Sequence, residues 1–209
     1  MMRRVVGLMI VLLILSSTAF SQDVQFGVKA GPNFPRLHVD KQGGTVTSKT
    51  STTFHIGLYA TIMSSEKFGI QTELMFSQQG GDLDSANMSL SYLTLPVLAR
   101  YNVLPWLSIH AGPQLGVLLS AKDGSADIMS QFKSLDLSLA SGVAFELPAN
   151  FQVSLRYIHG LTNISAVDFS LIGIPGPDPV FTNRLFQISL GYTFSRSGSS
   201  KQPGLGRTP

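Results

Sequence analysis

The chain has 209 residues, no cysteine and a formal net charge of +3, from 15 Lys and Arg against 12 Asp and Glu. Without cysteine it can be neither cross-linked by disulfides nor anchored as a lipoprotein. Only 13% of the residues are charged, about half the usual share of a soluble domain, and no basic patch with interleaved aromatics points to nucleic acid as a partner.

The first residues have the organisation of a secretory signal peptide. Arg3 and Arg4 form a basic head, residues 5–15 an apolar core, and Ala19-Phe20-Ser21 a cleavage site before Gln22. The apolar run is too short for a membrane-spanning helix. We therefore predict a signal peptide at 1–21, one domain at 22–195, and a tail at 196–209 whose Ser, Gly and Pro content is typical of disorder. The alternatives are an uncleaved amphipathic anchor at the start and a periplasmic tether at the end.

Between these ends the sequence alternates apolar and polar residues. A period of two over about nine residues predicts a half-buried strand, and the number of such segments leaves no room for helices. Mean hydropathy is positive although no long apolar run follows the signal, which is typical of transmembrane strands. The segments cover, in chain order, residues 26–34, 54–62, 68–76, 92–101, 107–117, 135–147, 151–157 and 186–194.

The links between the segments alternate between short and long. Short links are expected at 64–67, 104–105 and 148–150, and long ones at 36–51, 79–89, 121–133 and 162–182. This arrangement predicts an all-β fold, an eight-stranded antiparallel up-and-down transmembrane β-barrel, with both ends on the short-turn side and no open edge. Prolines inside three of the segments, Pro32, Pro96 and Pro113, predict a bulge or a projecting strand end at each site.

Alternation alone does not distinguish a membrane barrel from a soluble lipocalin-like barrel, which has its apolar face inside. The polar face decides in favour of the membrane, because its few charges and many small residues suit a filled, narrow lumen. We predict a polar network in the lumen formed by Lys29, His55, Glu73, Arg100, His110, Asp136, Glu146 and Arg156.

Aromatic residues on the apolar face lie towards the segment ends, where interfacial girdles form in outer-membrane barrels. The predicted girdle near the short turns contains Phe26, Phe68, Tyr101, Phe145, Phe151, Tyr192 and Phe194. The predicted girdle near the long loops contains Phe34, Phe54, Phe76, Tyr157 and Phe186.

Several segments together resemble one known family. The stretches are GVKAGPNF, FHIGLYA, EKFGIQTELMFSQQG, YLTLPVLARY, LSIHAGPQLGVLLSAK, VSLRYIHGLTNIS and NRLFQISLGYTF. They resemble the PorT-like outer-membrane β-barrel proteins of Bacteroidetes-type bacteria. The resemblance covers roughly residues 23–195 and implies an eight-stranded barrel, in a family whose name-giving member is linked to protein secretion. It supplies no catalytic motif, and such chains tend to stop at the last aromatic strand, whereas this one continues.

No motif for catalysis, phosphate binding or a Cys/His metal site is present. His55 and His110 share the lumen face, so a metal pair is conceivable, but two histidines in a hydrogen-bond network are favoured. We therefore expect no catalytic residue, no metal and no cofactor.

The sequence thus predicts a non-enzymatic outer-membrane protein with a binding, envelope-structure or secretion-associated role. The expected partners are outer-membrane lipid and other envelope or secretion proteins, after export through the periplasm. One alternative is a small-solute channel lined by the lumen charges. The other is a lipid hydrolase of the outer leaflet that uses His159, whose in-phase neighbour Leu161 cannot serve as nucleophile or acid.

Overall fold

Strands account for almost all of the regular structure in the computed structural model of the chain, which describes residues 23–41, 44–47, 51–83, 86–165 and 180–197. The predicted signal peptide, most of the predicted tail and residues 166–179 lie outside the described residues. Among the described residues, no helix is long and apolar enough to cross a membrane.

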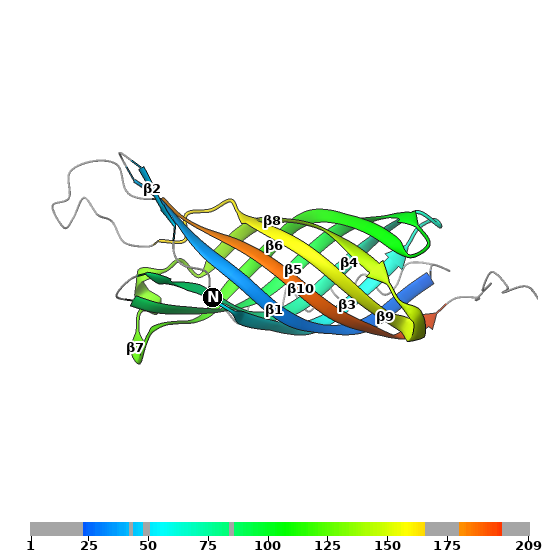
Figure 1. The fold of residues 1–209 in the computed structure, drawn as a ribbon, viewed down its shortest axis with the longest axis horizontal. Coiled ribbons are helices and arrows are strands. Elements are labelled where there is room, and N and C mark those ends of the chain that lie inside the picture. The colour runs from blue at the N-terminus through cyan, green and yellow to red at the C-terminus, as the bar shows by residue number, and fades with distance from the viewer. Residues whose placement is uncertain (1–22, 42–43, 48–50, 84–85, 166–179, 198–209) are drawn as a thin grey trace, which may run out of the picture.

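Eight strands form one closed antiparallel cylinder, as predicted. Each pairs with its neighbours in chain order, and the last pairs with the first, for example Val28 with Tyr192 and Phe34 with Phe186. The strands run obliquely around the long axis (Figure 1). They are β1 (Asp23–Lys41), β3 (Thr53–Met63), β4 (Phe68–Leu83), β5 (Ala86–Leu104), β6 (Leu107–Asp123), β8 (Leu135–Glu146), β9 (Phe151–Gly160) and β10 (Val180–Ser197).

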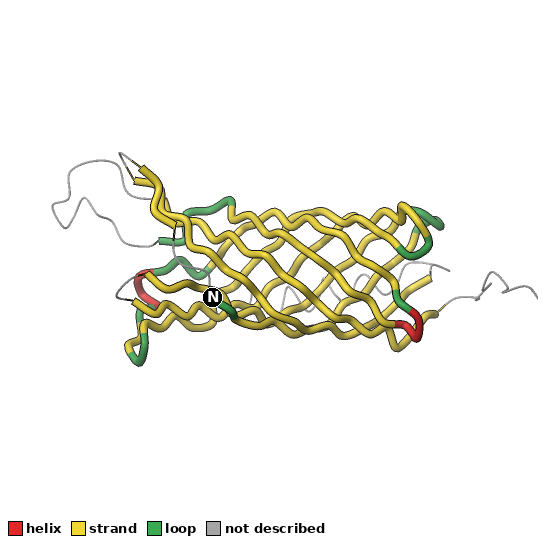
Figure 2. Tube along the Cα trace, in the orientation of Figure 1, coloured by secondary structure: helices red, strands yellow, loops and turns green. Residues whose placement is uncertain are grey.

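The two ends of the cylinder differ. One end, here called the short-turn end, has tight connections after Met63, Leu104 and Glu146, the last containing the 3-10 turn η2 (Pro148–Asn150). At the other, the loop end, β1 and β6 continue into hairpins with β2 (Gly44–Thr47) and β7 (Ala126–Asp127), and the 3-10 turn η1 (Met129–Gln131) follows. Figure 2 shows η1 and η2 in red at opposite ends. Short turns face the periplasm in outer-membrane barrels, so the loop end faces outward from the cell.

The prediction of a long loop at 79–89 is wrong. β4 and β5 pair continuously from Gln79–Leu90 to Leu83–Ala86, so this segment is a hairpin that continues beyond the rest of the wall. Gly80 supports the path with φ of 125°, which glycine adopts without the steric cost of a Cβ. The prediction failed because the alternation changes phase here: Met88 and Leu90 share the inward phase of Tyr92 and pack in an interior apolar cluster, whereas the apolar face of the wall below points outward.

The three prolines are accommodated without the predicted bulges. The register of β1 with β10 passes from Ala30–Leu190 to Asn33–Gln187 without a shift, so the ladder only lapses at Pro32. The β5–β6 ladder likewise lapses between Pro96–Gln114 and Ala99–Ala111, opposite Pro113, without a shift. A missing donor therefore costs a local pairing but does not alter the register.

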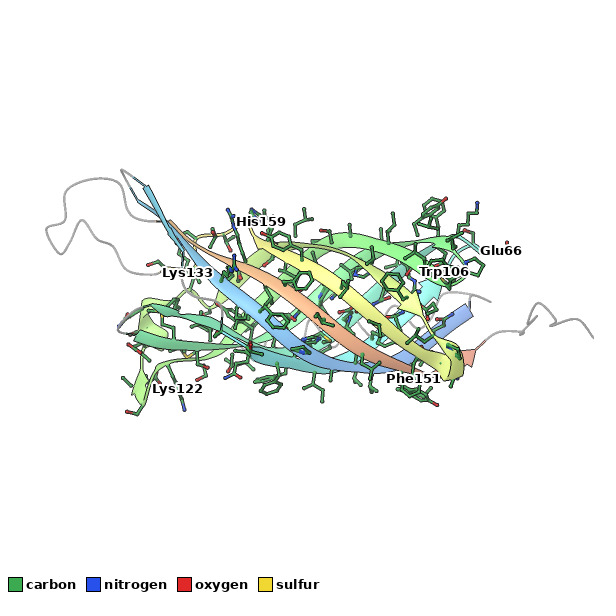
Figure 3. The ribbon with its side chains drawn as sticks, in the orientation of Figure 1. Glu66, Trp106, Lys122, Lys133, Phe151 and His159 are labelled. Atoms are coloured by element: carbon green, nitrogen blue, oxygen red, sulfur yellow. The ribbon has the colours of Figure 1, made fainter. Side chains whose placement is uncertain are left out.

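Apolar side chains cover the outside and polar ones fill the inside. Ile56, Leu58 and Ile70 are more than half exposed, whereas the alternate residues His55 and Gln71 are almost fully buried. The alternation continues around the wall and gives the barrel an apolar exterior and a packed polar interior. Figure 3 shows Trp106 and Phe151 at the short-turn end and Lys122 and His159 towards the loop end.

Candidate functional site: the polar lumen

An ionic cluster occupies the middle of the lumen. Glu73 on β4, 1% exposed, accepts hydrogen bonds from Arg156 Nη1 and Nη2 on β9 at 2.7 Å each. The same carboxylate accepts from Lys29 Nζ on β1 at 2.7 Å, and Arg156 Nε donates to His110 Nε2 on β6 at 3.2 Å. One carboxylate therefore compensates two buried cations, which would otherwise be very costly to desolvate. Four strands are joined across the barrel by these contacts.

A second ionic contact lies nearer the short-turn end. Arg100 pairs with Glu146, and Gln152 Nε2 also donates to Glu146 Oε1 at 2.6 Å. Gln71 links this contact to the central cluster, because its Oε1 accepts from Arg100 Nη1 at 3.2 Å and its Nε2 donates to Glu73 Oε1 at 2.6 Å. The lumen charges therefore form one continuous hydrogen-bonded network from the middle to the short-turn end.

His55 belongs to a separate neutral cluster, in which its two ring nitrogens have different partners. Nδ1 lies 2.7 Å from Asn33 Oδ1, which can only accept, and Nε2 lies 2.7 Å from Ser189 Oγ. Serine, histidine and asparagine in this order have the connectivity of a nucleophile, a base and an orienting group. All three side chains are at most 3% exposed, so the cluster has no face open to a substrate and acts as packing.

Asp136 lies apart from the other charges of the predicted network, near the loop end. It accepts from Thr162 Oγ1 at 2.8 Å and from Asn183 Nδ2 at 3.3 Å. Within the part of the chain that the structure describes, both partners are neutral. Hydrogen bonds from neutral groups therefore satisfy this carboxylate.

An apolar cluster lies at the loop end. Leu90, Tyr92, Leu118, Ala121, Ile128 and Ile164 pack together and are buried, with Met88, Met129 and Phe132 around them. Two of these, Ile128 and Ile164, come from connections rather than barrel strands, and Lys133 N donates to Ile164 O at 2.8 Å to join the two connections. The loops after β7 and β9 are thus packed against the barrel.

The structure places all eight predicted lumen residues on the inside, in three groups and not in one network. His55 and His110 have different hydrogen-bond partners, and no group of three or more potential metal ligands is found among the described residues. Sequence reasoning missed two sets of neutral residues: Gln71 and Gln152, which contact the charges, and Asn33, Gln187 and Ser189, which form the cluster of His55. Their positions in the inward phase were the available signal, since most buried polar groups find a hydrogen-bond partner.

The predicted girdle residues lie on the outside and contact one another across strands. Near the short turns, Phe68 and Tyr101 have ring centroids 4.7 Å apart, and Phe151 and Tyr192 5.2 Å apart. Near the loop end, Phe54 and Phe76 are 5.8 Å apart. Trp106, which was not predicted, stacks on Phe145 with ring centroids 6.3 Å apart. It was missed because it lies in a turn, outside the alternating segments.

A closed eight-stranded antiparallel cylinder with an apolar exterior and a hydrogen-bonded polar interior defines the class of outer-membrane β-barrels. The sequence profile of the outer membrane protein beta-barrel domain matches residues 20–166, and the chain belongs to this family. The protein is therefore an outer-membrane β-barrel protein.

Solved structures of this class resemble the chain in fold. Neisserial surface protein A has a TM-score of 0.50 at 13% identity, covering 81% of this chain and 97% of that one. Ail, the attachment invasion locus protein of Yersinia pestis, has 0.48 at 12%, covering 84% and 100%. OprG of Pseudomonas aeruginosa has 0.45 at 15%, covering 83% and 97%. No curated protein sequence matches the chain significantly.

Proposed function

We propose that this protein is a closed, non-enzymatic outer-membrane barrel whose loop end binds a component of the cell envelope. The observation that carries the proposal is the blocked lumen. Glu73, Arg156 and Lys29 fill its middle, and the apolar cluster around Leu118 packs connections against its loop end.

The blocked lumen argues against the alternative of a small-solute channel. A conducting path needs water or mobile ions along the axis, whereas the central charges are bound to each other at hydrogen-bond distance. Separating them inside a narrow barrel would leave uncompensated charges in a medium of low dielectric constant. The charges serve to hold the wall together instead.

The loop end supports a binding role. The β4–β5 hairpin extends past Phe76 and Tyr92, the last aromatic residues of its strands, and β6 continues into a hairpin with β7. The connections that contain Ile128 and Ile164 pack in the apolar cluster beneath them. Binding residues commonly lie on loops that a rigid scaffold positions. The resemblance to PorT-like chains favours secretion proteins as the class of partner.

The environment of His159 does not favour a lipid hydrolase. Its cross-strand neighbours are Leu139 on β8 and Arg184 on β10, and its ring lies 6.3 Å from that of Tyr157. None of these residues supplies the acid that would orient a catalytic histidine.

Conductance in planar bilayers tests the closed lumen. The folded protein, verified by its altered gel mobility before boiling, is expected to be silent under conditions in which a porin reconstituted in parallel conducts. Steady openings of the wild-type protein would favour the channel.

Photo-crosslinking in native membranes tests the binding end. A crosslinking residue at Lys122, on the β6–β7 hairpin, is expected to trap a discrete envelope protein, while the same residue at Lys67, in the β3–β4 turn, traps none of it. The opposite result would move the binding surface to the periplasmic side.

A further inference from the structure

Two arginines and a histidine form a row across three neighbouring strands on the outside of the barrel. Arg184 on β10 is directly opposite Arg36 on β1 and, on its other side, directly opposite His159 on β9. The flanking residues Asn183 and Leu185 are buried, so Arg184 has the outward phase of its strand. We call Arg36, Arg184 and His159 the basic row.

The basic row borders a row of aromatic rings. Phe34, Phe186 and Tyr157 are paired across the same three strands, two residues nearer the middle of each strand. The rings of Phe34 and Phe186 are 6.4 Å apart. Aromatic belts lie at the boundary between hydrocarbon and headgroups. A further two residues along a strand is roughly 6.6 Å, which places the basic row among the headgroups of the outer leaflet.

The charges of the basic row favour the binding of an anion. Like charges directly opposite on adjacent strands repel and destabilise a sheet, yet Arg36 and Arg184 are opposite each other. Arg184 Nε is buried and has no hydrogen-bond partner among the described residues. Arg36 already takes part in another interaction, so Arg184 is the residue on which the site depends. A guanidinium binds phosphate oxygens through parallel N–H donors, and a phosphate between two arginines would turn their repulsion into attraction.

We infer that the basic row of Arg36, Arg184 and His159 binds the phosphate group of an outer-leaflet lipid, whose acyl chains lie along the apolar surface below. The depth of the row selects a lipid in preference to a soluble anion. Phe34, Phe186 and Tyr157 would contact the acyl chains at the point where they meet the headgroup. This site is independent of the proposed binding by the hairpins and of whether the lumen conducts.

Retention of lipid tests the inference directly. The folded protein in phosphatidylcholine nanodiscs doped with diphosphorylated lipid A is released into the gas phase, and the lipid A that stays bound is measured by mass spectrometry. The wild type is expected to retain it. The double variant, Arg36→Gln with Arg184→Gln, is expected to weaken retention about thirtyfold, because each arginine lost removes roughly one basic contact with the headgroup. Arg184→Gln alone, for the case in which the double variant does not fold, is expected to weaken it about fivefold.

Three controls decide the outcome. Lys133→Gln removes one charge from the same end outside the row and is expected to change retention by less than about twofold. The wild type is expected to lose affinity when the lipid A lacks its phosphates. Its retention of that lipid should be no stronger than the retention of phosphorylated lipid A by the double variant. Unchanged retention in Arg184→Gln, equal retention of the dephosphorylated lipid, or displacement by millimolar inorganic phosphate would each overturn the inference.

Discussion

Glu73 and Arg156 are joined across the lumen by two parallel hydrogen bonds of 2.7 Å, Nη1 to Oε2 and Nη2 to Oε1. Their strands, β4 and β9, are not neighbours in the wall, so the pair acts as a brace through the interior. Lys29 adds a third strand to the brace.

Replacing Glu73 by Gln should destabilise the barrel strongly, because it leaves Lys29 and Arg156 buried without their shared anion. Breaking a buried ion pair from one side typically costs about 3–5 kcal/mol. The free energy of unfolding, measured by urea titration in lipid vesicles, checks this value. As a matched control, Glu66→Gln alters an exposed turn residue and should have little effect. A loss at Glu73 no larger than that at Glu66 would contradict the brace.

Leu190→Arg should be far less tolerated than Asp136→Asn. Leu190 lies between Phe186 and Phe194 on the outer face and is 54% exposed, so the arginine would enter hydrocarbon at a cost of about 2–4 kcal/mol near the midplane. Asp136 accepts hydrogen bonds only from neutral groups among the described residues, so an amide strands no cation and should cost about 1 kcal/mol. Unfolding in vesicles compares the two. Equal losses would contradict the assignment of the faces.

Asn33→Ala should destabilise the part of the lumen towards the loop end, because the Asn33 side chain connects several strands. It donates to Phe54 O at 3.0 Å and Gln78 O at 2.8 Å, and it accepts from Gln187 Nε2 at 2.9 Å and from His55. Stranding these buried groups should cost about 2–3 kcal/mol. Asn102→Ala is the control and should cost less, because it removes one exposed contact to Glu66 O and one long contact of 3.4 Å from Arg100 Nε. Comparable losses would mean that water replaces Asn33.

Gly31→Ala and Gly191→Ala should differ although the two glycines lie on adjacent strands. A Cβ on Gly31 would collide with the carbonyl oxygen of Ile188, whereas one on Gly191 would meet Lys29 Cβ and Val28 O at an ordinary 3.5 Å. Gly31→Ala should therefore reduce the yield of folded barrel, and Gly191→Ala should not. The folded fraction on an unboiled gel measures both. Equal yields would show that the β1–β10 seam can open to admit a methyl group.

The wall was predictable from the sequence because strands with one face in lipid must alternate. The pattern Phe54, Ile56, Leu58 against His55, Gly57, Tyr59 assigns strand and face together. The hairpin that joins β4 to β5 was missed, because its apolar residues Met88 and Leu90 point inward, out of phase with the apolar face of the wall.

The contacts inside the lumen could not be derived from the sequence. Alternation shows that Glu73 and Arg156 point inward, but not that they meet. Their meeting depends on the stagger of eight strands around the cylinder, and one residue of slip in any strand would change the partners. The three groups of the lumen therefore had to come from the structure. The secretory signal, the tail and a secretion-associated role stay predictions.

The seam between β1 and β10 joins the first and last strands of the wall, and this has a consequence for biogenesis. A nascent chain that has not yet delivered β10 has two open edges, on β1 and on β9, whose amide groups would find no partner in hydrocarbon. The protein therefore cannot be assembled stepwise in lipid as it emerges. Closure of the cylinder therefore has to be the last step of its assembly, and both edges need shelter from hydrocarbon until β10 is in place.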